Sequence, residues 1–141
     1  MTTDNTVNRY VVLDTETTGM PVTDGHRIIE IGCVELLGRR LTGRHFHVYL
    51  NPDREIDEGA IAVHGITNEF LRDKPLFAQI GRAFLDFVGE ARLVIHNAAF
   101  DMKFLNAELG WAQKPLIPAD RALDTLAMAR RKFPGSPATL D

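Results

Sequence analysis

The chain has 141 residues, of which 45% are apolar, 25% are charged and 8% are aromatic. This is the composition of a soluble globular domain, and it excludes collagen-like, disordered and disulfide-framework proteins. With 16 Lys and Arg residues against 19 Asp and Glu residues, the formal net charge is −3, which argues against binding of nucleic acid through a broad basic face.

Three strands are predicted in the first half of the chain. An apolar run spans Tyr10–Leu13, and a second run rich in β-branched residues lies within Arg27–Leu37. Polar and apolar residues then alternate over His45–Leu50, which is typical of a half-buried strand. Because Gly38 and Gly43 interrupt the chain between the second and third runs, we expect these strands to form an antiparallel meander.

Helical spacing appears in the second half of the chain. One predicted helix carries apolar residues at i, i+3 and i+4 spacing, namely Leu76, Phe77, Ile80, Phe84, Phe87 and Val88. A fourth strand, Leu93–Ile95, leads into a helix whose apolar residues are Phe100, Phe104, Leu105 and Leu109. Arg121–Leu123 is a candidate fifth strand, and Thr125–Phe133 is a predicted helix with a basic last turn. This order of elements predicts an α/β fold in which helices flank a mixed sheet.

The chain shows no sign of subdivision, secretion or membrane insertion. No internal repeat and no linker rich in Gly, Ser or Pro divides it, so we expect a single domain over residues 1–141. The single cysteine, Cys33, can form no disulfide within the chain. The polar first residues lack the apolar stretch of a signal peptide, and no apolar run approaches the roughly 18 residues of a membrane span. These features predict a cytoplasmic location and no membrane partner.

The strongest local signal is the segment Asp14–Gly19, at the end of the first predicted strand. Side chains at i and i+2 of a strand point to the same face, so Asp14 and Glu16 should present their carboxylates side by side. Two neighbouring anions after an apolar strand repel each other and are costly to desolvate. A divalent cation relieves that cost, and oxygen ligands favour Mg²⁺ or Mn²⁺. The alternative is a solvated turn that binds nothing.

A further carboxylate, Asp101, follows the fourth predicted strand. It lies in the first turn of the next helix, where it is placed to add a third metal ligand. A helix N-terminal charge without a ligand is the alternative. Because Asp14 and Asp101 both follow strand ends, neighbouring strands would bring them together. His96, at the strand end, is expected to orient the turn from Asn97 to Asp101.

His64 is the third candidate, because Val63 and Gly65 place its imidazole beside a flexible turn. A lone histidine among apolar residues is more often structural than functional. Its position alone leaves both interpretations open.

Taken together, these segments resemble the DEDD superfamily of 3′–5′ exonucleases, which has a ribonuclease-H-like fold. The matching motifs are Asp-Thr-Glu-Thr-Thr-Gly at residues 14–19, Val-His-Gly-Ile-Thr at 63–67 and Val-Ile-His-Asn-Ala-Ala-Phe-Asp at 94–101. Within the superfamily, the stretches at residues 40–43, 46–50 and 73–75 resemble the family of proofreading (epsilon) subunits of bacterial DNA polymerase III. The resemblance runs from Tyr10 to Asp141.

The resemblance implies phosphodiester hydrolysis with two divalent ions, Mg²⁺ or Mn²⁺, and removal of mispaired 3′-terminal nucleotides. By motif position, Asp14 would bridge both ions, Glu16 would bind the ion that carries the attacking water, and Asp101 would bind the other ion. His64 would contact the terminal nucleotide. The implied partners are the single-stranded 3′ end of DNA, the catalytic (alpha) subunit of the polymerase and its small theta subunit.

Three apolar residues near these motifs are candidates to pack on the terminal base and sugar. They are Met20, Val63 and Phe100. Stacking of this kind is worth about 1–3 kcal/mol per base and tolerates any sequence. Packing in the protein core is the alternative for each of them.

The chain departs from the family pattern after Asp101. The family places a histidine general base five residues before a fourth carboxylate, but this sequence has no histidine beyond His96. Asp120, Asp124 and Asp141 therefore lack the required partner. We expect the 141 residues to be a poor nuclease or an inactive one, because general-base help contributes about 10²–10⁴-fold in rate.

Two explanations of this departure remain open. The first explanation is an exonuclease domain truncated before its last helices. It is favoured by the final residues, which predict the start of a helix with Thr139 as its N-cap. Such a chain would expose part of its sheet and have marginal stability. The second is a non-catalytic module associated with a polymerase. A stand-alone exonuclease acting on RNA or short oligonucleotides is a further alternative within the same chemistry.

Overall fold

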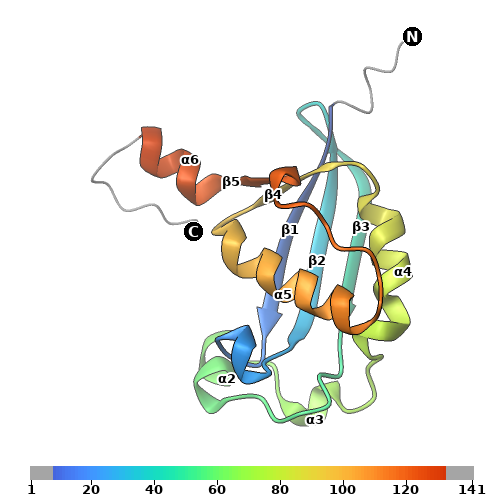
Figure 1. The fold of residues 1–141 in the computed structure, drawn as a ribbon, viewed down its shortest axis with the longest axis vertical. Coiled ribbons are helices and arrows are strands. Elements are labelled where there is room, and N and C mark those ends of the chain that lie inside the picture. Colours follow the sequence, from blue (N-terminus) through green and yellow to red (C-terminus); the bar gives the residue numbers. More distant parts are fainter. Residues whose placement is uncertain (1–7, 133–141) are drawn as a thin grey trace.

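The computed structural model describes residues 8–132 (Figure 1). Its elements in chain order are β1 (Arg9–Thr17), the 3-10 helix η1 (Val22–Asp24), β2 (Ile28–Leu37), β3 (Arg40–Tyr49), α2 (Glu58–His64), α3 (Asn68–Leu71), α4 (Phe77–Val88), β4 (Arg92–Ile95), α5 (Ala98–Trp111), the 3-10 helix η2 (Ala119–Arg121), β5 (Ala122–Asp124) and α6 (Thr125–Lys132). The expected helix start at Thr139 and the expected helix end at Phe133 lie outside the described residues.

The strands form one mixed sheet in the order β3-β2-β1-β4-β5. β1 pairs antiparallel with β2, and β2 pairs antiparallel with β3. β1 pairs parallel with β4, and β4 pairs parallel with β5. The predicted fold, an antiparallel meander extended by parallel strands and flanked by helices, is confirmed.

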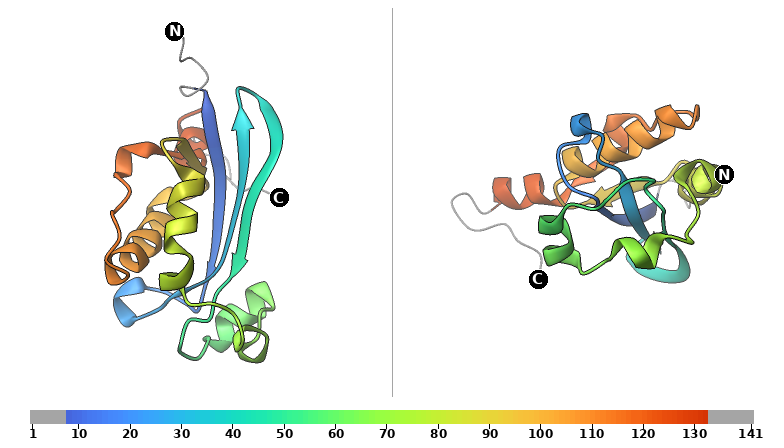
Figure 2. Two further views of the ribbon diagram at one scale, coloured as in Figure 1. Left: turned by 90° about the vertical axis from the view of Figure 1, so that its right-hand side faces the viewer. Right: turned by 90° about the horizontal axis from the view of Figure 1, so that it is seen from below.

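Helices α4 and α5 lie on the same side of the sheet and form the core with it (Figure 2). Alternation along β1 explains this packing, since Val11 and Leu13 are buried while Val12 between them is exposed. α4 buries Phe84 and Phe87 against the strands. Leu76 was expected on the same buried stripe, but this prediction is wrong. Leu76 precedes the helix as its N-cap residue and is exposed.

β1 is longer than the apolar run that predicted it. The strand continues from Leu13 to Thr17 because Thr15 and Thr17 extend the buried alternation with β-branched side chains. It also extends five residues beyond its last pairing with β4, which joins Val12 to Val94. The end of β1 is therefore open on the β4 side, next to the beginning of α5.

The short helices α2 and α3 were not predicted. They lie at the end of the sheet toward which β1 runs (Figure 1). A small apolar cluster of Ile29, Ile56 and Leu71 attaches them to β2. Within the described part of the chain, no helix is long and apolar enough to cross a membrane.

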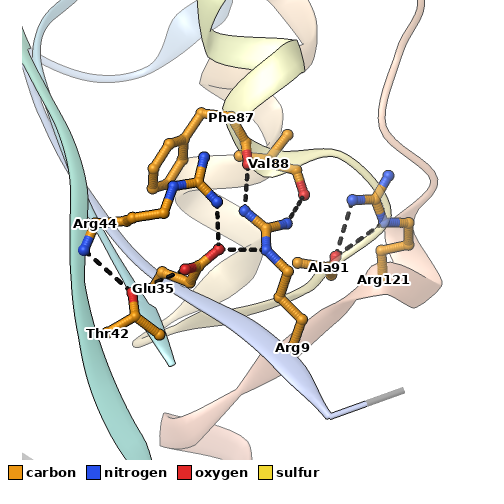
Figure 3. Close-up of polar contacts among 8 residues, drawn as sticks. All are labelled: Arg9, Glu35, Thr42, Arg44, Phe87, Val88, Ala91 and Arg121. Atoms are coloured by element: carbon orange, nitrogen blue, oxygen red, sulfur yellow. Dashed lines mark hydrogen bonds and ion pairs between the residues drawn. The ribbon is translucent and has the colours of Figure 1, made fainter. Parts of the chain in front are cut away.

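At the opposite end of the sheet, arginine side chains bind the end of α4 and the chain that follows it (Figure 3). Arg9 donates hydrogen bonds to the carbonyls of Phe87 and Val88 and to the carboxylate of Glu35. Arg121 donates to backbone carbonyls just after α4. Because helix carbonyls near the C-terminus lack intrahelical partners, Arg9 caps α4 and fixes it to β1, while Arg121 holds the chain after α4 to the end of η2.

Candidate active site

Asp14 and Glu16 lie on the same face of β1, as predicted, near the open end of the strand. Asp14 is exposed and Glu16 is partly buried. Burial raises the pKa of Glu16, the neighbouring carboxylate of Asp14 raises it further, and His64 acts in the opposite direction. Desolvation therefore acts on Glu16, whereas the carboxylate of Asp14 stays exposed.

Asp101 lies in the first turn of α5, as predicted, and is 5% exposed. The hydroxyl of Thr15 donates to Asp101 Oδ2 at 3.3 Å, so α5 contacts the part of β1 that β4 leaves open. Burial raises the pKa of Asp101 to about 7, and the charge of Asp14 adds to this effect against the hydrogen bonds from Thr15. The structure thus brings Asp14, Glu16 and Asp101 into one electrostatically coupled group.

The donor chemistry of this group fits a hard divalent cation. Carboxylate oxygens suit Mg²⁺ and Mn²⁺, and a cation would relieve the repulsion that raises the pKa of Glu16 and of Asp101. Among residues 8–132, no three His, Cys, Asp or Glu side chains converge closely enough to hold one ion as they stand. The fit therefore rests on chemistry and charge, and the carboxylates would have to converge on binding.

His64 ends α2 and turns its ring toward β1. Its Nδ1 accepts a hydrogen bond from the backbone N–H of Ile66 at 3.1 Å. The proton of the neutral ring therefore lies on Nε2, which donates to the carbonyl of Thr17 at 3.2 Å. Two backbone groups fix the imidazole, and its charge, when it is protonated, acts on Glu16 across the cavity.

A cavity of about 390 Å³ lies between the end of β1, α2 and the first turn of α5. Its walls include Glu16, His64 and all three apolar candidates, namely Met20, Val63 and Phe100. Met20 is 71% exposed and Val63 is 84% exposed, so core packing does not explain either residue. Phe100 is half-buried against Phe104, with ring centroids 4.9 Å apart. The cavity has an acidic side and an apolar side.

The prediction that His96 orients the turn between β4 and α5 is wrong. His96 Nδ1 lies 3.0 Å from Thr125 Oγ1, so His96 contacts the start of α6 instead of the turn. The carboxylate of Asp124 accepts a hydrogen bond from the backbone N–H of Asn97 at 3.0 Å. Asn97 has a left-handed backbone (φ 62°), a conformation that Asn tolerates better than most residues. Asp124 was considered only as a possible fourth carboxylate, and no sequence pattern indicated this contact.

Two further polar residues beside the cavity were missed by the sequence patterns. His26 is buried between Thr18 and Asp57, and Asp57 lines the cavity. His26 and Asp57 stand 31 positions apart in the sequence, and neither belongs to a recognisable motif. Only a prediction of the path of the loops could have brought them together.

Comparison with solved structures supports the fold. The chain superposes on exonuclease X in complex with 5′ overhanging duplex DNA, with a TM-score of 0.69 and 26% identity over 92% of this chain and 68% of that one. It also superposes on a product-bound exonuclease I, with a TM-score of 0.79 and 18% identity over 95% of this chain and 34% of that one. The second likeness shows a shared fold only.

Sequence comparison finds nearer relatives. The chain is 52% identical over 136 residues to the DNA polymerase III subunit epsilon of Rickettsia felis, covering 94% of this chain and 59% of that protein. It is 49% identical over 142 residues to the protein of the same name from Escherichia coli, covering 96% and 58% respectively. The chain thus spans somewhat over half the length of these relatives. The sequence pattern of the exonuclease family (RNase_T) matches residues 11–141, and the chain belongs to that family.

Proposed function

We propose that this chain belongs to a proofreading 3′–5′ exonuclease, a protein that removes mispaired 3′-terminal nucleotides from DNA as mononucleotides. One observation carries the proposal: Glu16 lines a cavity with an apolar wall, and its carboxylate is electrostatically coupled to those of Asp14 and Asp101. Such a site can hold a phosphodiester on one side and a nucleobase on the other. Membership in the exonuclease family and the similarity to epsilon subunits support the same assignment.

The three carboxylates are the residues that would hold two divalent ions, Mg²⁺ or Mn²⁺. Bound ions would supply charge neutralisation at the scissile phosphate and make an attacking hydroxide accessible near neutral pH. Asp14 raises the pKa of both Glu16 and Asp101, which supports a bridging position for Asp14 between the other two. Glu16 would then serve the water-carrying side and Asp101 the other side.

The apolar wall and His64 would hold the terminal nucleotide. The side chains of Met20 and Val63 are exposed, and Phe100 is half-buried, so all three are accessible to a base or sugar. The imidazole of His64 is fixed by its two backbone contacts and needs little reorganisation to meet a ligand. Contacts with the face of a base tolerate any sequence, as proofreading requires.

Two groups that hydrolysis would need are not supplied by these 141 residues. The sequence has no histidine after His96, so we infer that the general base implied by the family resemblance, and the carboxylate that would accompany it, are not among them. We expect the 141-residue chain alone to hydrolyse DNA slowly or not at all, because general-base help contributes about 10²–10⁴-fold.

The proposed partners are a frayed single-stranded 3′ end and a polymerase that delivers it. The net charge of −3 argues against a broad basic surface, so binding of DNA to this chain alone should be weak, with a shallow dependence on salt. By similarity to epsilon subunits, the expected protein partners are the alpha and theta subunits of DNA polymerase III.

The test uses the full-length gene product and the 141-residue chain with a 3′-labelled, mismatched DNA primer and Mg²⁺. We expect the full-length protein to release mononucleotides, and Asp14→Ala to abolish the release. Asp14 is exposed, so this substitution should leave the fold intact. Asp86→Ala, an exposed acid on α4 away from the cavity, is the matched control and should retain activity.

The alternatives predict different results in the same assay. If the full-length protein releases nothing but still binds the polymerase alpha subunit in a pull-down, it is a non-catalytic module. Faster release from an RNA primer than from a DNA primer would support a stand-alone exonuclease acting on RNA.

A further inference from the structure

His26 is almost completely buried, with 5% of its surface exposed, although it lies in the loop between η1 and β2. Both ring nitrogens face polar groups. Nδ1 lies 2.8 Å from Thr18 Oγ1, and Nε2 lies 3.4 Å from Asp57 Oδ2. The imidazole thus joins the residue after β1 to the residue before α2.

The hydroxyl of Thr18 determines which ring nitrogen of His26 accepts a hydrogen bond and which one donates. Thr18 Oγ1 already accepts a hydrogen bond from the backbone N–H of Arg27 at 3.1 Å. Its own hydrogen is therefore free to be donated to His26 Nδ1, which places the ring proton on Nε2, facing the carboxylate of Asp57. A neutral His26 is thus held in one tautomer and one orientation.

The side chain of Asp57 contacts His26 and does not make the hydrogen bond that is usual for its position in the chain. Asp57 is the N-cap residue of α2, where an Asp side chain usually accepts a hydrogen bond from the first turn of its own helix. Here the side chain makes no cap hydrogen bond and faces His26, while Arg54 approaches its other oxygen at 4.0 Å. The backbone N–H of Asp57 also donates to the carbonyl of Thr18 at 2.9 Å, so a second contact holds the residue after β1 to the residue before α2. We call this contact region of Thr18, His26 and Asp57 the joint.

Gly19 provides an independent sign of close packing at this joint. A Cβ atom on Gly19 would lie 2.7 Å from Asp57 Oδ2 and 2.7 Å from His26 Cε1. The backbone after β1 therefore packs directly on the His26–Asp57 pair. Only a residue without a side chain fits at this position.

The joint determines where α2 lies relative to the carboxylates. α2 begins just after Asp57 and ends at His64, which contacts the carbonyl of Thr17. Val63 and His64 line one wall of the cavity, and Glu16 and Thr17 line the facing wall. A shift at the start of the seven-residue helix would move Val63 and His64 together.

We propose that His26 is a positioning residue: by bridging Thr18 and Asp57 it sets the width of the cavity between β1 and α2, and so the affinity for the terminal nucleotide. This inference rests on the proposed function of the cavity for its ligand. The positioning itself does not depend on that function, because it concerns the placement of His64 in the ligand-free protein.

The test dissects the two contacts of His26 in the full-length protein. His26→Asn keeps a polar group near the position of Nδ1 and loses the contact with Asp57, whereas His26→Gln reaches toward Asp57. Asp57→Asn removes the charge while keeping the size of a side chain that is 53% exposed, so this variant should fold even if the variants at position 26 do not. His45→Asn, on exposed β3, is the matched control.

Two measurements are made on each variant, with thymidine 5′-monophosphate and Mg²⁺ as the probe. We expect His26→Asn and Asp57→Asn to weaken binding of the nucleotide roughly tenfold or more. The NMR signals of the His64 ring in the nucleotide-free protein should shift in both variants. His26→Gln should recover part of each effect, and the control should change neither.

Two results would overturn the proposal. One is that Asp57→Asn binds the nucleotide like the wild type and leaves the His64 signals in place. The other is that His26→Asn lowers only the thermal midpoint, with nucleotide affinity unchanged while the protein is folded. If the wild type itself fails to bind the nucleotide, the proposed function fails, and the His64 signals still decide whether His26 positions α2.

Discussion

The guanidinium of Arg27 donates two hydrogen bonds to the buried carboxylate of Glu108, at 2.9 and 2.6 Å. Glu108 is 1% exposed, and it also accepts the backbone N–H of Ile28 at 3.0 Å. The ring of Trp111 covers the guanidinium, 4.9 Å from its centroid. This ion pair fixes the start of β2 to α5, the helix that carries Asp101.

Replacing Glu108 by Ala should lower the free energy of unfolding by about 3–5 kcal/mol, because the change leaves a partly buried arginine and a backbone N–H without an acceptor. The measurement is the urea midpoint and slope at pH 7. Glu90→Gln, an exposed acid after α4, is the control and should change the free energy by less than about 0.5 kcal/mol. An equal effect of the two substitutions would show that the Arg27–Glu108 pair contributes nothing specific.

The fold was predictable because its main signals are local and periodic. Alternation and helical spacing located the strands and the two long helices, and the antiparallel pairing of the first three strands followed from their connections, whereas the full strand order came only from the structure. The end of β1 was predicted too early, because the apolar run stops at Leu13. Thr15 and Thr17 continue the buried face, but threonine is a polar residue and does not extend an apolar pattern. α2 and α3 have seven and four residues and bury few side chains, so neither helix shows enough apolar periodicity to be predicted.

The candidate site was predictable only where motifs mark it. Asp14 and Glu16 lie near the end of β1 and Asp101 lies in the first turn of α5, where the motifs predicted them, and their charges are coupled. His26, Asp57 and the Asp124 contact were missed because each depends on how two loops distant in sequence pack together. Arg27 was missed for the same reason, since its partner stands 81 positions away.

Glu35 should make stability depend on pH. Burial acts to raise its pKa, but hydrogen bonds from Arg9 and Thr42 and the charges of Arg9 and Arg44 outweigh burial, and the pKa is lowered from 4.5. A carboxyl with a lowered folded pKa contributes stability above its unfolded pKa, and this contribution is lost as the pH falls through the folded value. The wild type should therefore lose stability below about pH 4.5 as Glu35 is protonated.

The variant Glu35→Gln isolates this contribution. At pH 7 we expect a loss of about 1.5–3 kcal/mol, the range for hydrogen bonds to a charged group. The difference from the wild type should shrink as the pH falls toward 3. Urea unfolding at several pH values measures it, with exposed Glu55→Gln as control. A difference that is constant with pH would contradict the assigned role of the charge.

Val63 offers a test of the apolar wall with little risk to the fold. Because its side chain is 84% exposed, Val63→Ala should change the free energy of unfolding by less than about 0.5 kcal/mol. If Val63 packs on the terminal base, affinity for thymidine 5′-monophosphate should fall by about 1 kcal/mol, roughly fivefold. Leu41→Ala, 70% exposed on β3 and away from the cavity, is the matched control. Equal affinities of the two variants would remove Val63 from the site.

Asp101 should destabilise the metal-free protein at alkaline pH. Burial, followed by the charge of Asp14, raises its pKa from 3.8 to about 7. Between these values the folded state holds a proton that the unfolded state has released, so stability falls as the pH rises from about 4 to 7. Asp101→Asn cannot ionise, and in the absence of divalent ions it should be about 1–3 kcal/mol more stable than the wild type at pH 8.

Divalent ions should reverse this order of stability. A ligand that binds only the folded state stabilises it by about 2.7 kcal/mol at a concentration one hundred times its dissociation constant. Mg²⁺ or Mn²⁺ at pH 8 should therefore raise the melting temperature of the wild type and change that of Asp101→Asn much less. Calorimetric scans with and without the ion measure both effects, and Asp86→Asn, an exposed acid on α4, should respond like the wild type. If Asp101→Asn gains as much from the ion as the wild type does, Asp101 is not a ligand, and its raised pKa reflects burial alone.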